Sequence, residues 1–187
     1  MEETIENLAR KIFRIGPSKD EVICPPDQVF LNPNFGFLLT LGGYVVDGDV
    51  EYQKLMTLIK ELGEKEFFIM ENLGATRTER NDPFRATIPV DKNLDYFKSL
   101  EKAFEPDFGF LPFSYFVFGK NTNWGIYVCE YPTINIIGCA KELAEEFSTV
   151  FGIDGNGFLQ QEDFIRKEFR NRNDLMERLI NNYRLQH

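Results

Sequence analysis

Apolar residues recur along this chain with two different periods. From Ile5 to Phe13 they follow helical spacing, which predicts an amphipathic helix. The same spacing marks residues 52–62, 94–104, 143–150 and 165–183. Short apolar runs bounded by turn residues predict strands at 35–41, 44–46, 67–70, 84–90, 108–118, 124–129 and 134–137. The pattern therefore predicts roughly five or six helices and six or seven strands.

Short turns connect several of the predicted strands. Gly42 and Gly43 separate residues 35–41 from residues 44–46, which predicts a hairpin. Sequential strands with short turns favour an antiparallel sheet, and we expect the helices on one side of it. The predicted fold class is α+β with a mostly antiparallel sheet. We expect an α+β domain over residues 1–152 and a helical C-terminal extension over residues 153–187 that packs on it.

Composition supports a well-filled apolar core. The chain has 187 residues, of which 43% are hydrophobic, so it can bury a large core without a disulfide or a structural metal. It contains 19 phenylalanines and one tryptophan. Because a phenylalanine ring needs no hydrogen-bond partner, we expect a core rich in phenylalanine.

The formal net charge of −9 limits the choice of partners. A field of this sign repels phosphate backbones and anionic lipid, so we expect neither nucleic acid nor a membrane surface as a partner. It attracts a basic protein. The alternative is that the charge serves only solubility.

The cysteines and the histidine exclude several kinds of catalysis. Cys24, Cys129 and Cys139 have no metal-type spacing, so we expect free buried thiols in a reducing compartment. His187 is the single histidine and the last residue. Ser-His-Asp, Cys-His and His-ligated zinc chemistry would therefore need a base from a partner chain. The N-terminus has no signal-peptide pattern and the apolar runs are too short for a membrane span, so the expected location is cytoplasmic.

Residues 152–163 resemble the calcium loop of EF-hand proteins. Asp154 and Asn156 match the third and fifth positions of that loop, and Gly157 matches its sharp turn. The first position differs, because Gly152 has no carboxylate. The candidate metal ligands are Asp154, Asn156, Phe158 and Asp163. The alternative is a tight turn between helices in which Asp154 or Asp163 caps a helix. Calcium is the one cofactor that the sequence suggests.

Two glutamates follow apolar strands. Glu71 ends the run FFIME and Glu130 follows WGIYVC. If they were neighbours, one carboxylate would raise the pKa of the other, and the pair would act as acid and base or hold magnesium. Otherwise each marks the point where a strand reaches water. These two residues are the candidate catalytic groups of a carboxylate-based, metal-assisted hydrolase.

Trp124 follows the polar turn 121–123 and begins a predicted strand. A tryptophan in this position is either a binding hot spot or a core residue. Together with Glu130 it is a candidate partner-binding residue. No glycine-rich phosphate-binding motif occurs.

The stretch FVFGKNTNWGIYVCEYPTINIIGC, followed by a helix with Phe147 and Phe151, resembles bacterial toxin-immunity proteins, including the SUKH-like ones. This resemblance implies a cytoplasmic α+β protein that binds and blocks a toxin, often a basic one. The leading hypothesis is therefore a non-catalytic protein-binding domain for a basic partner. The hydrolase and a weak calcium-binding protein are the alternatives, and no residue excludes a structural role.

Overall fold

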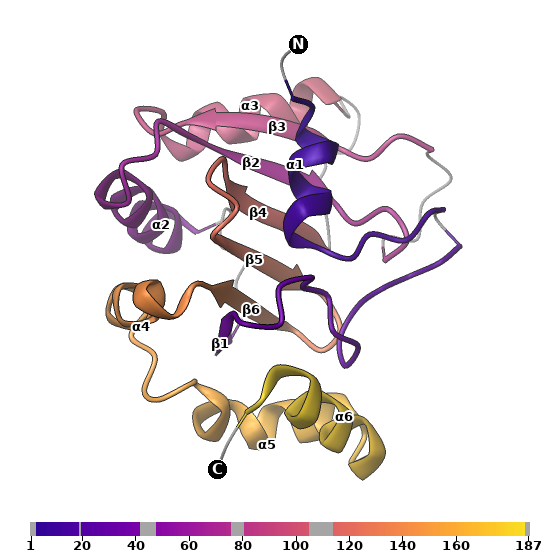
Figure 1. Cartoon of the computed structure of the whole chain (residues 1–187). Helices are drawn as coiled ribbons and strands as arrows, with labels where there is room; N and C mark the ends of the chain where they lie inside the picture. The colour runs from indigo at the N-terminus through magenta and orange to yellow at the C-terminus, as the bar shows by residue number, and fades with distance from the viewer. Residues whose placement is uncertain (1–2, 19, 42–47, 76–80, 105–113, 186–187) are drawn as a thin grey trace.

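Six strands form one sheet in the computed structural model, which describes residues 3–18, 20–41, 48–75, 81–104 and 114–185. The spatial order is β1-β6-β5-β4-β2-β3, and every neighbouring pair is antiparallel (Figure 1). In chain order the strands are β1 (Gly36–Leu41), β2 (Glu66–Glu71), β3 (Arg85–Pro89), β4 (Tyr115–Gly119), β5 (Trp124–Cys129) and β6 (Ile134–Cys139). The predicted α+β class with a mostly antiparallel sheet is confirmed.

Helices precede, interrupt and follow the strands. They are α1 (Ile5–Ile12), α2 (Asp49–Glu61), α3 (Leu94–Phe104), α4 (Ala144–Phe151), α5 (Phe158–Glu168) and α6 (Asn173–Tyr183), with the 3-10 turn η1 (Lys141–Leu143) before α4. The Thr4 hydroxyl caps α1 by accepting a hydrogen bond from the Asn7 N–H at 3.2 Å. Within the described ranges, no helix has the length and apolar character needed to cross a bilayer.

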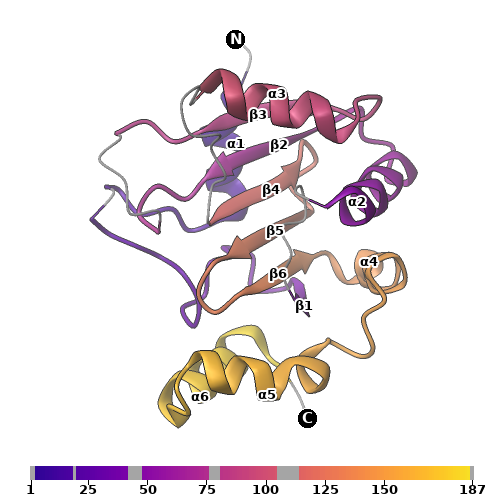
Figure 2. The same cartoon turned by 180° about the vertical axis from the view of Figure 1, so that it is seen from behind.

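Both faces of the sheet are buried, so the expectation of helices on one side was wrong. Along β5, Trp124 and Ile126 enter one apolar cluster, whereas Tyr127 enters the other. Side chains of α2, α3 and α4 complete the first cluster, and those of α1, α5, α6 and residues 13–35 complete the second (Figures 1 and 2). Because consecutive residues of the central strands are apolar, each strand needs cover on both sides.

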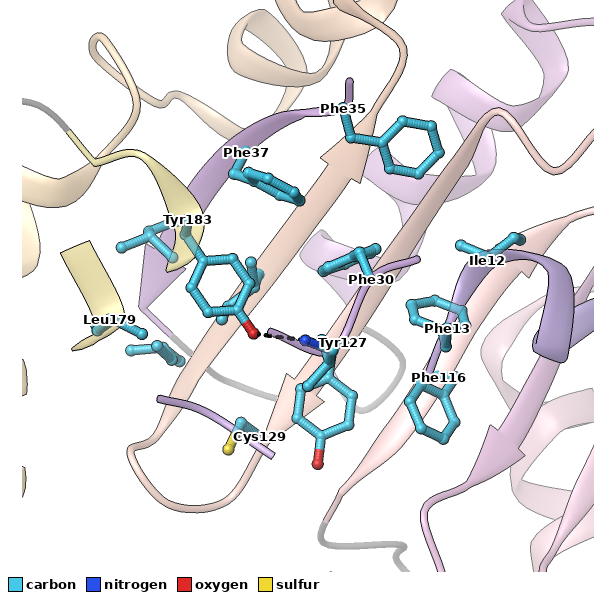
Figure 3. Close-up of a cluster of buried hydrophobic side chains, with 14 of the residues drawn as sticks. Ile12, Phe13, Phe30, Phe35, Phe37, Phe116, Tyr127, Cys129, Leu179 and Tyr183 are labelled. Atoms are coloured by element: carbon cyan, nitrogen blue, oxygen red, sulfur yellow. Dashed lines mark hydrogen bonds between the residues drawn. The ribbon is translucent and has the colours of Figure 1, made fainter. Parts of the chain in front are cut away.

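The C-terminal helices share the second cluster with the sheet. The β1 residue Leu39 donates its N–H to the Asn156 carbonyl at 2.8 Å, so the loop before α5 binds the edge of the sheet. The Tyr183 hydroxyl accepts the Val29 N–H at 3.1 Å and donates to the Asp27 carbonyl at 2.5 Å (Figure 3). Residues 153–185 are thus joined to both the sheet and the N-terminal segment.

Some predicted elements lie outside the described residues. These are the hairpin turn at 42–43 with the strand at 44–46, the first part of the predicted strand at 108–118, and His187. Among the described strands, β1 pairs with β6, and Leu38 lies opposite Ile137.

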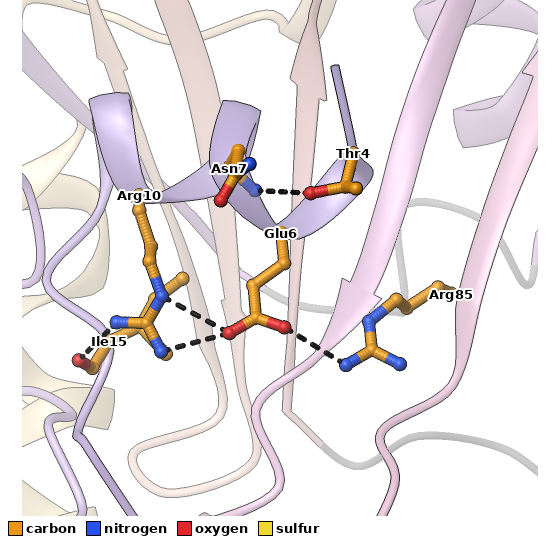
Figure 4. Close-up of polar contacts among 6 residues, drawn as sticks. All are labelled: Thr4, Glu6, Asn7, Arg10, Ile15 and Arg85. Carbon is orange, nitrogen blue, oxygen red and sulfur yellow. Dashed lines mark hydrogen bonds and ion pairs between the residues drawn. The ribbon is translucent and has the colours of Figure 1, made fainter. Parts of the chain in front are cut away.

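A charged triad joins α1 to the edge strand β3 (Figure 4). The Glu6 carboxylate accepts hydrogen bonds from the Arg10 guanidinium at 3.0 and 3.1 Å and from the Arg85 guanidinium at 3.1 Å. Arg10 also donates to the Ile15 carbonyl at 3.2 Å. The hydrogen bond from Arg10 is the main cause that lowers the pKa of Glu6 below its usual 4.5, and partial burial opposes it.

The Glu6→Gln variant is expected to be less stable than the native chain by less than about 1 kcal/mol at neutral pH, because all three groups are partly exposed. A carboxyl with a lowered folded-state pKa stabilises the fold above its unfolded pKa, and this contribution disappears as pH falls through the folded value. The difference in unfolding free energy between the native chain and Glu6→Gln should therefore shrink as the pH falls from neutral to below 4.5, as measured by urea unfolding. The control is Glu177→Gln, on the exposed surface of α6. A stability difference for Glu6→Gln that persists in acid would contradict the stabilising role of the Glu6 carboxylate.

Candidate functional site

A depression of about 680 Å³ lies where β4 begins and β5 ends. We call it the Glu130 pocket. Its lining residues are Val22, Cys24, Gly74, Ala75, Ser114, Cys129, Glu130 and Tyr131. Because β4 and β5 are antiparallel, the residue before β4 and the residues after β5 meet at the same end of the sheet.

Asn72 holds three segments together beside this pocket. Its N–H donates to the Ser114 carbonyl at 2.8 Å. Its side-chain amide donates to the Ile23 carbonyl at 3.1 Å and to the Tyr127 hydroxyl at 2.9 Å. Asn72 is buried, so these bonds replace water for the amide. One residue, through its backbone and its side chain, thus fixes residues 22–24, the start of β4 and β5 relative to one another.

A neutral hydroxyl supports the backbone of Glu130. The Glu130 N–H donates to the Ser114 hydroxyl oxygen at 3.2 Å. Burial raises the pKa of Tyr127 well above its usual value, so its hydroxyl stays neutral. In Figure 3 this hydroxyl points away from the phenylalanine cluster that surrounds Phe116. The Glu130 backbone is held in place while its side chain stays exposed.

Tyr131 forms the aromatic rim of the pocket. It is 52% exposed, and its hydroxyl donates to the Glu168 carbonyl at the end of α5. The Glu168 carboxylate accepts hydrogen bonds from the N–H and hydroxyl of Thr133 at 3.2 and 3.1 Å. Phe169 meets the Tyr131 ring edge-on, with centroids 6.3 Å apart. The turn after β5 is therefore anchored to α5.

Two free thiols form part of the pocket wall. Cys129 is buried and Cys24 is half-buried. Burial is the main cause that raises the pKa of each thiol, and neighbouring negative groups add to it: Asp27 for Cys24, and Glu130 and Glu168 for Cys129. Both thiols therefore stay protonated at neutral pH and are poor nucleophiles. The Asp27, Glu130 and Glu168 carboxylates thus lie close enough to act on these thiols.

Of the three thiols expected to be buried, Cys129 and Cys139 are buried and Cys24 is half-buried. Cys139, the third cysteine, is buried on the opposite face of the sheet, and burial is the main cause that raises its pKa to about 12.

Glu71 and Glu130 line separate depressions. Glu71 is 1% exposed, and its carboxylate accepts the Phe84 N–H at 2.9 Å. It lines a depression of about 200 Å³ with the Glu6 triad. In register, Glu71 lies opposite Tyr115, which lies opposite Val128. Two strand spacings and two residues thus separate the glutamates, a Cα distance of about 12 Å. The structure does not bring the proposed catalytic pair together.

The calcium-loop candidates form a turn between α4 and α5. The Asp154 carboxylate accepts a hydrogen bond from Gln160 at 3.1 Å, and the Asn156 side-chain oxygen accepts the Phe158 N–H at 3.0 Å. Asp163 is exposed on α5, which already begins at Phe158. In the part of the chain that the structure describes, no three His, Cys, Asp or Glu side chains are grouped to hold a metal. Calcium binding stays a hypothesis.

Trp124 occupies the core. It is fully buried, and its ring lies 5.8 Å from that of Phe147 on α4. In this conformation it contributes nothing to the surface, whereas Glu130, the other predicted partner-binding residue, is exposed.

Sequence reasoning missed Ser114, which lines the pocket, and Asn72 and Tyr127, which lie beside it. Asn72 directly follows Glu71, and a second polar residue at the end of a strand is the signal that would have found it. Ser114 and Tyr127 become neighbours of Asn72 only through the β2-β4-β5 register.

The Tyr127→Phe variant is expected to lose about 1–2 kcal/mol of stability, because the buried Asn72 side-chain amide loses a hydrogen-bond acceptor. Urea unfolding followed by circular dichroism measures the loss. Tyr96→Phe, which removes a hydroxyl from α3, is the control. Equal losses for the two variants would contradict the supporting role of Tyr127.

Comparisons with known proteins found no match: no family model, no curated protein and no solved structure matches this chain.

Proposed function

We propose that this chain is a non-catalytic protein-binding domain whose acidic surface engages a basic protein, as an immunity protein engages the toxin it neutralises. The observation that carries the proposal is the Glu130 pocket. It combines the exposed Glu130 carboxylate, the exposed Tyr131 ring and the neutral Ser114, which holds the Glu130 backbone. Charged and aromatic side chains around a concave site favour protein recognition.

The distribution of charge supports this proposal. Residues 153–187 contain equal numbers of acidic and basic residues, so the net charge of −9 belongs to residues 1–152. At η1 and the start of α4, Glu142, Glu145 and Glu146 are exposed, and none forms an ion pair with a described residue. A negative field of this kind accelerates the approach of a cationic protein.

The free thiols of the pocket are protonated, and the two candidate carboxylates are separated. Neither pair provides an activated nucleophile or an acid/base couple. These features support binding rather than catalysis.

Affinity capture at low salt, identification of the captured protein and calorimetry with the purified partner test the proposal. We expect a basic partner whose affinity falls by about tenfold or more between low and high salt. Replacing Glu142, Glu145 and Glu146 together by glutamine should slow association. Lys98→Gln with Lys141→Gln, which makes the exposed surface more negative, should not weaken binding. An affinity that is independent of salt and of these charges would overturn the proposal.

A further inference from the structure

We infer that the Glu130 pocket receives an arginine side chain of the partner, with its guanidinium between the Glu130 carboxylate and the Tyr131 ring. This inference rests on the proposed function and places the recognition of the basic partner at the Glu130 pocket.

The rim offers the two groups that a guanidinium recognises. A planar guanidinium forms paired hydrogen bonds with a carboxylate and also stacks on an aromatic ring, whereas a lysine ammonium acts as a point charge. Glu130 and Tyr131 are adjacent in sequence, both line the pocket and both are exposed. Their combination favours arginine over lysine.

The walls suit the rest of an arginine side chain. Val22, Ala75 and the two protonated thiols present apolar or weakly polar surface. Arginine buries its methylene groups against such surface while its charged head meets polar groups. A volume of about 680 Å³ leaves room for the neighbouring backbone of the partner.

No cation of the chain itself occupies this place in the described structure. The described lining contains neither lysine nor arginine. Two arginines on the C-terminal segment are already paired, Arg172 with Asp174 and Arg178 with Asp27. Among the described residues, the Glu130 carboxylate forms no ion pair.

The site is organised before the ligand arrives. Ser114 holds the Glu130 backbone, and Glu168 holds the Tyr131 hydroxyl. The Tyr131 ring is therefore restrained before binding and loses less conformational entropy, whereas Glu130 is held only at its backbone.

Titration of the ¹⁵N-labelled chain with acetyl-Gly-Arg-Gly-amide tests the inference by NMR. We expect saturable, millimolar binding that shifts the amide signals of Gly74, Ala75, Glu130 and Tyr131. The citrulline tripeptide, a neutral isostere, should bind about fivefold more weakly, and Glu130→Gln should weaken arginine binding by a similar factor. Tyr131→Leu should reduce the preference for arginine over the lysine tripeptide.

Glu61→Gln is the matched control, because it removes one exposed carboxylate from the end of α2, on the opposite face of the sheet. It should leave the affinity for the tripeptide unchanged. The inference is overturned if citrulline or lysine binds as well as arginine, if the shifts lie outside the pocket, or if Glu61→Gln and Glu130→Gln weaken binding equally. The proposed function fails separately, when the affinity of the purified partner is independent of salt and of surface charge.

Discussion

Replacing Gly157 by alanine is expected to destabilise the protein by about 3 kcal/mol. Gly157 has a positive φ of 78°, and a Cβ on it would lie 2.0 Å from the Leu39 carbonyl oxygen and 2.9 Å from Ile153 Cγ2. The Leu39 oxygen belongs to strand backbone and cannot rotate away. The loop would have to withdraw from β1, which would break the hydrogen bond from Leu39 to Asn156. Urea unfolding at neutral pH measures the loss.

Gly155 provides a matched control two residues earlier. Its φ is also positive, at 59°, but a Cβ there would meet no atom within 4 Å. Gly155→Ala should therefore be destabilised only by the strain of an alanine in the left-handed conformation, about 1 kcal/mol. If both variants lose the same amount, the close approach of the loop to β1 is not what requires glycine at 157.

Trp124→Ala should destabilise the protein by about 3–5 kcal/mol, the usual cost of emptying a large buried aromatic site. The side chain is fully buried and packs against Phe147, so the cavity would lie between β5 and α4. Trp124→Phe keeps most of the apolar contact and should lose less than half as much. Thermal unfolding followed by circular dichroism suits both variants, since each lacks the single tryptophan of the chain.

The same pair of variants tests whether Trp124 takes part in partner binding. Trp124→Phe should bind the purified partner with unchanged affinity. A folded Trp124→Phe protein that no longer binds would show that this residue reaches the partner in another conformation.

The pattern of apolar residues along the chain was sufficient to predict most of the helices and strands. The strands at 67–70, 124–129 and 134–137 were predicted close to their observed bounds, because short apolar runs between turn residues are a local signal. The partner of β1 was not predictable in this way. Leu38 lies opposite Ile137, and a contact so distant in sequence has no local signal.

The site was predictable only at its rim. Glu130 stood out because an acidic residue directly follows an apolar run. Tyr127 looks like an ordinary strand residue, and its role depends on a hydrogen bond from Asn72 of a different segment. The pairing of Glu71 with Glu130 was a guess about register, and β4 lies between their strands.

The burial of both faces of the sheet separates the determinants of folding from those of recognition. In β4, β5 and β6 every residue is buried, so these strands present no side chains to a partner. Charge is displayed by helices, turns and strand ends, as at Glu130 and Glu145. Under the proposed function, substitutions there would change the choice of partner without altering the sheet, and the binding surface would diverge faster than the scaffold that carries it.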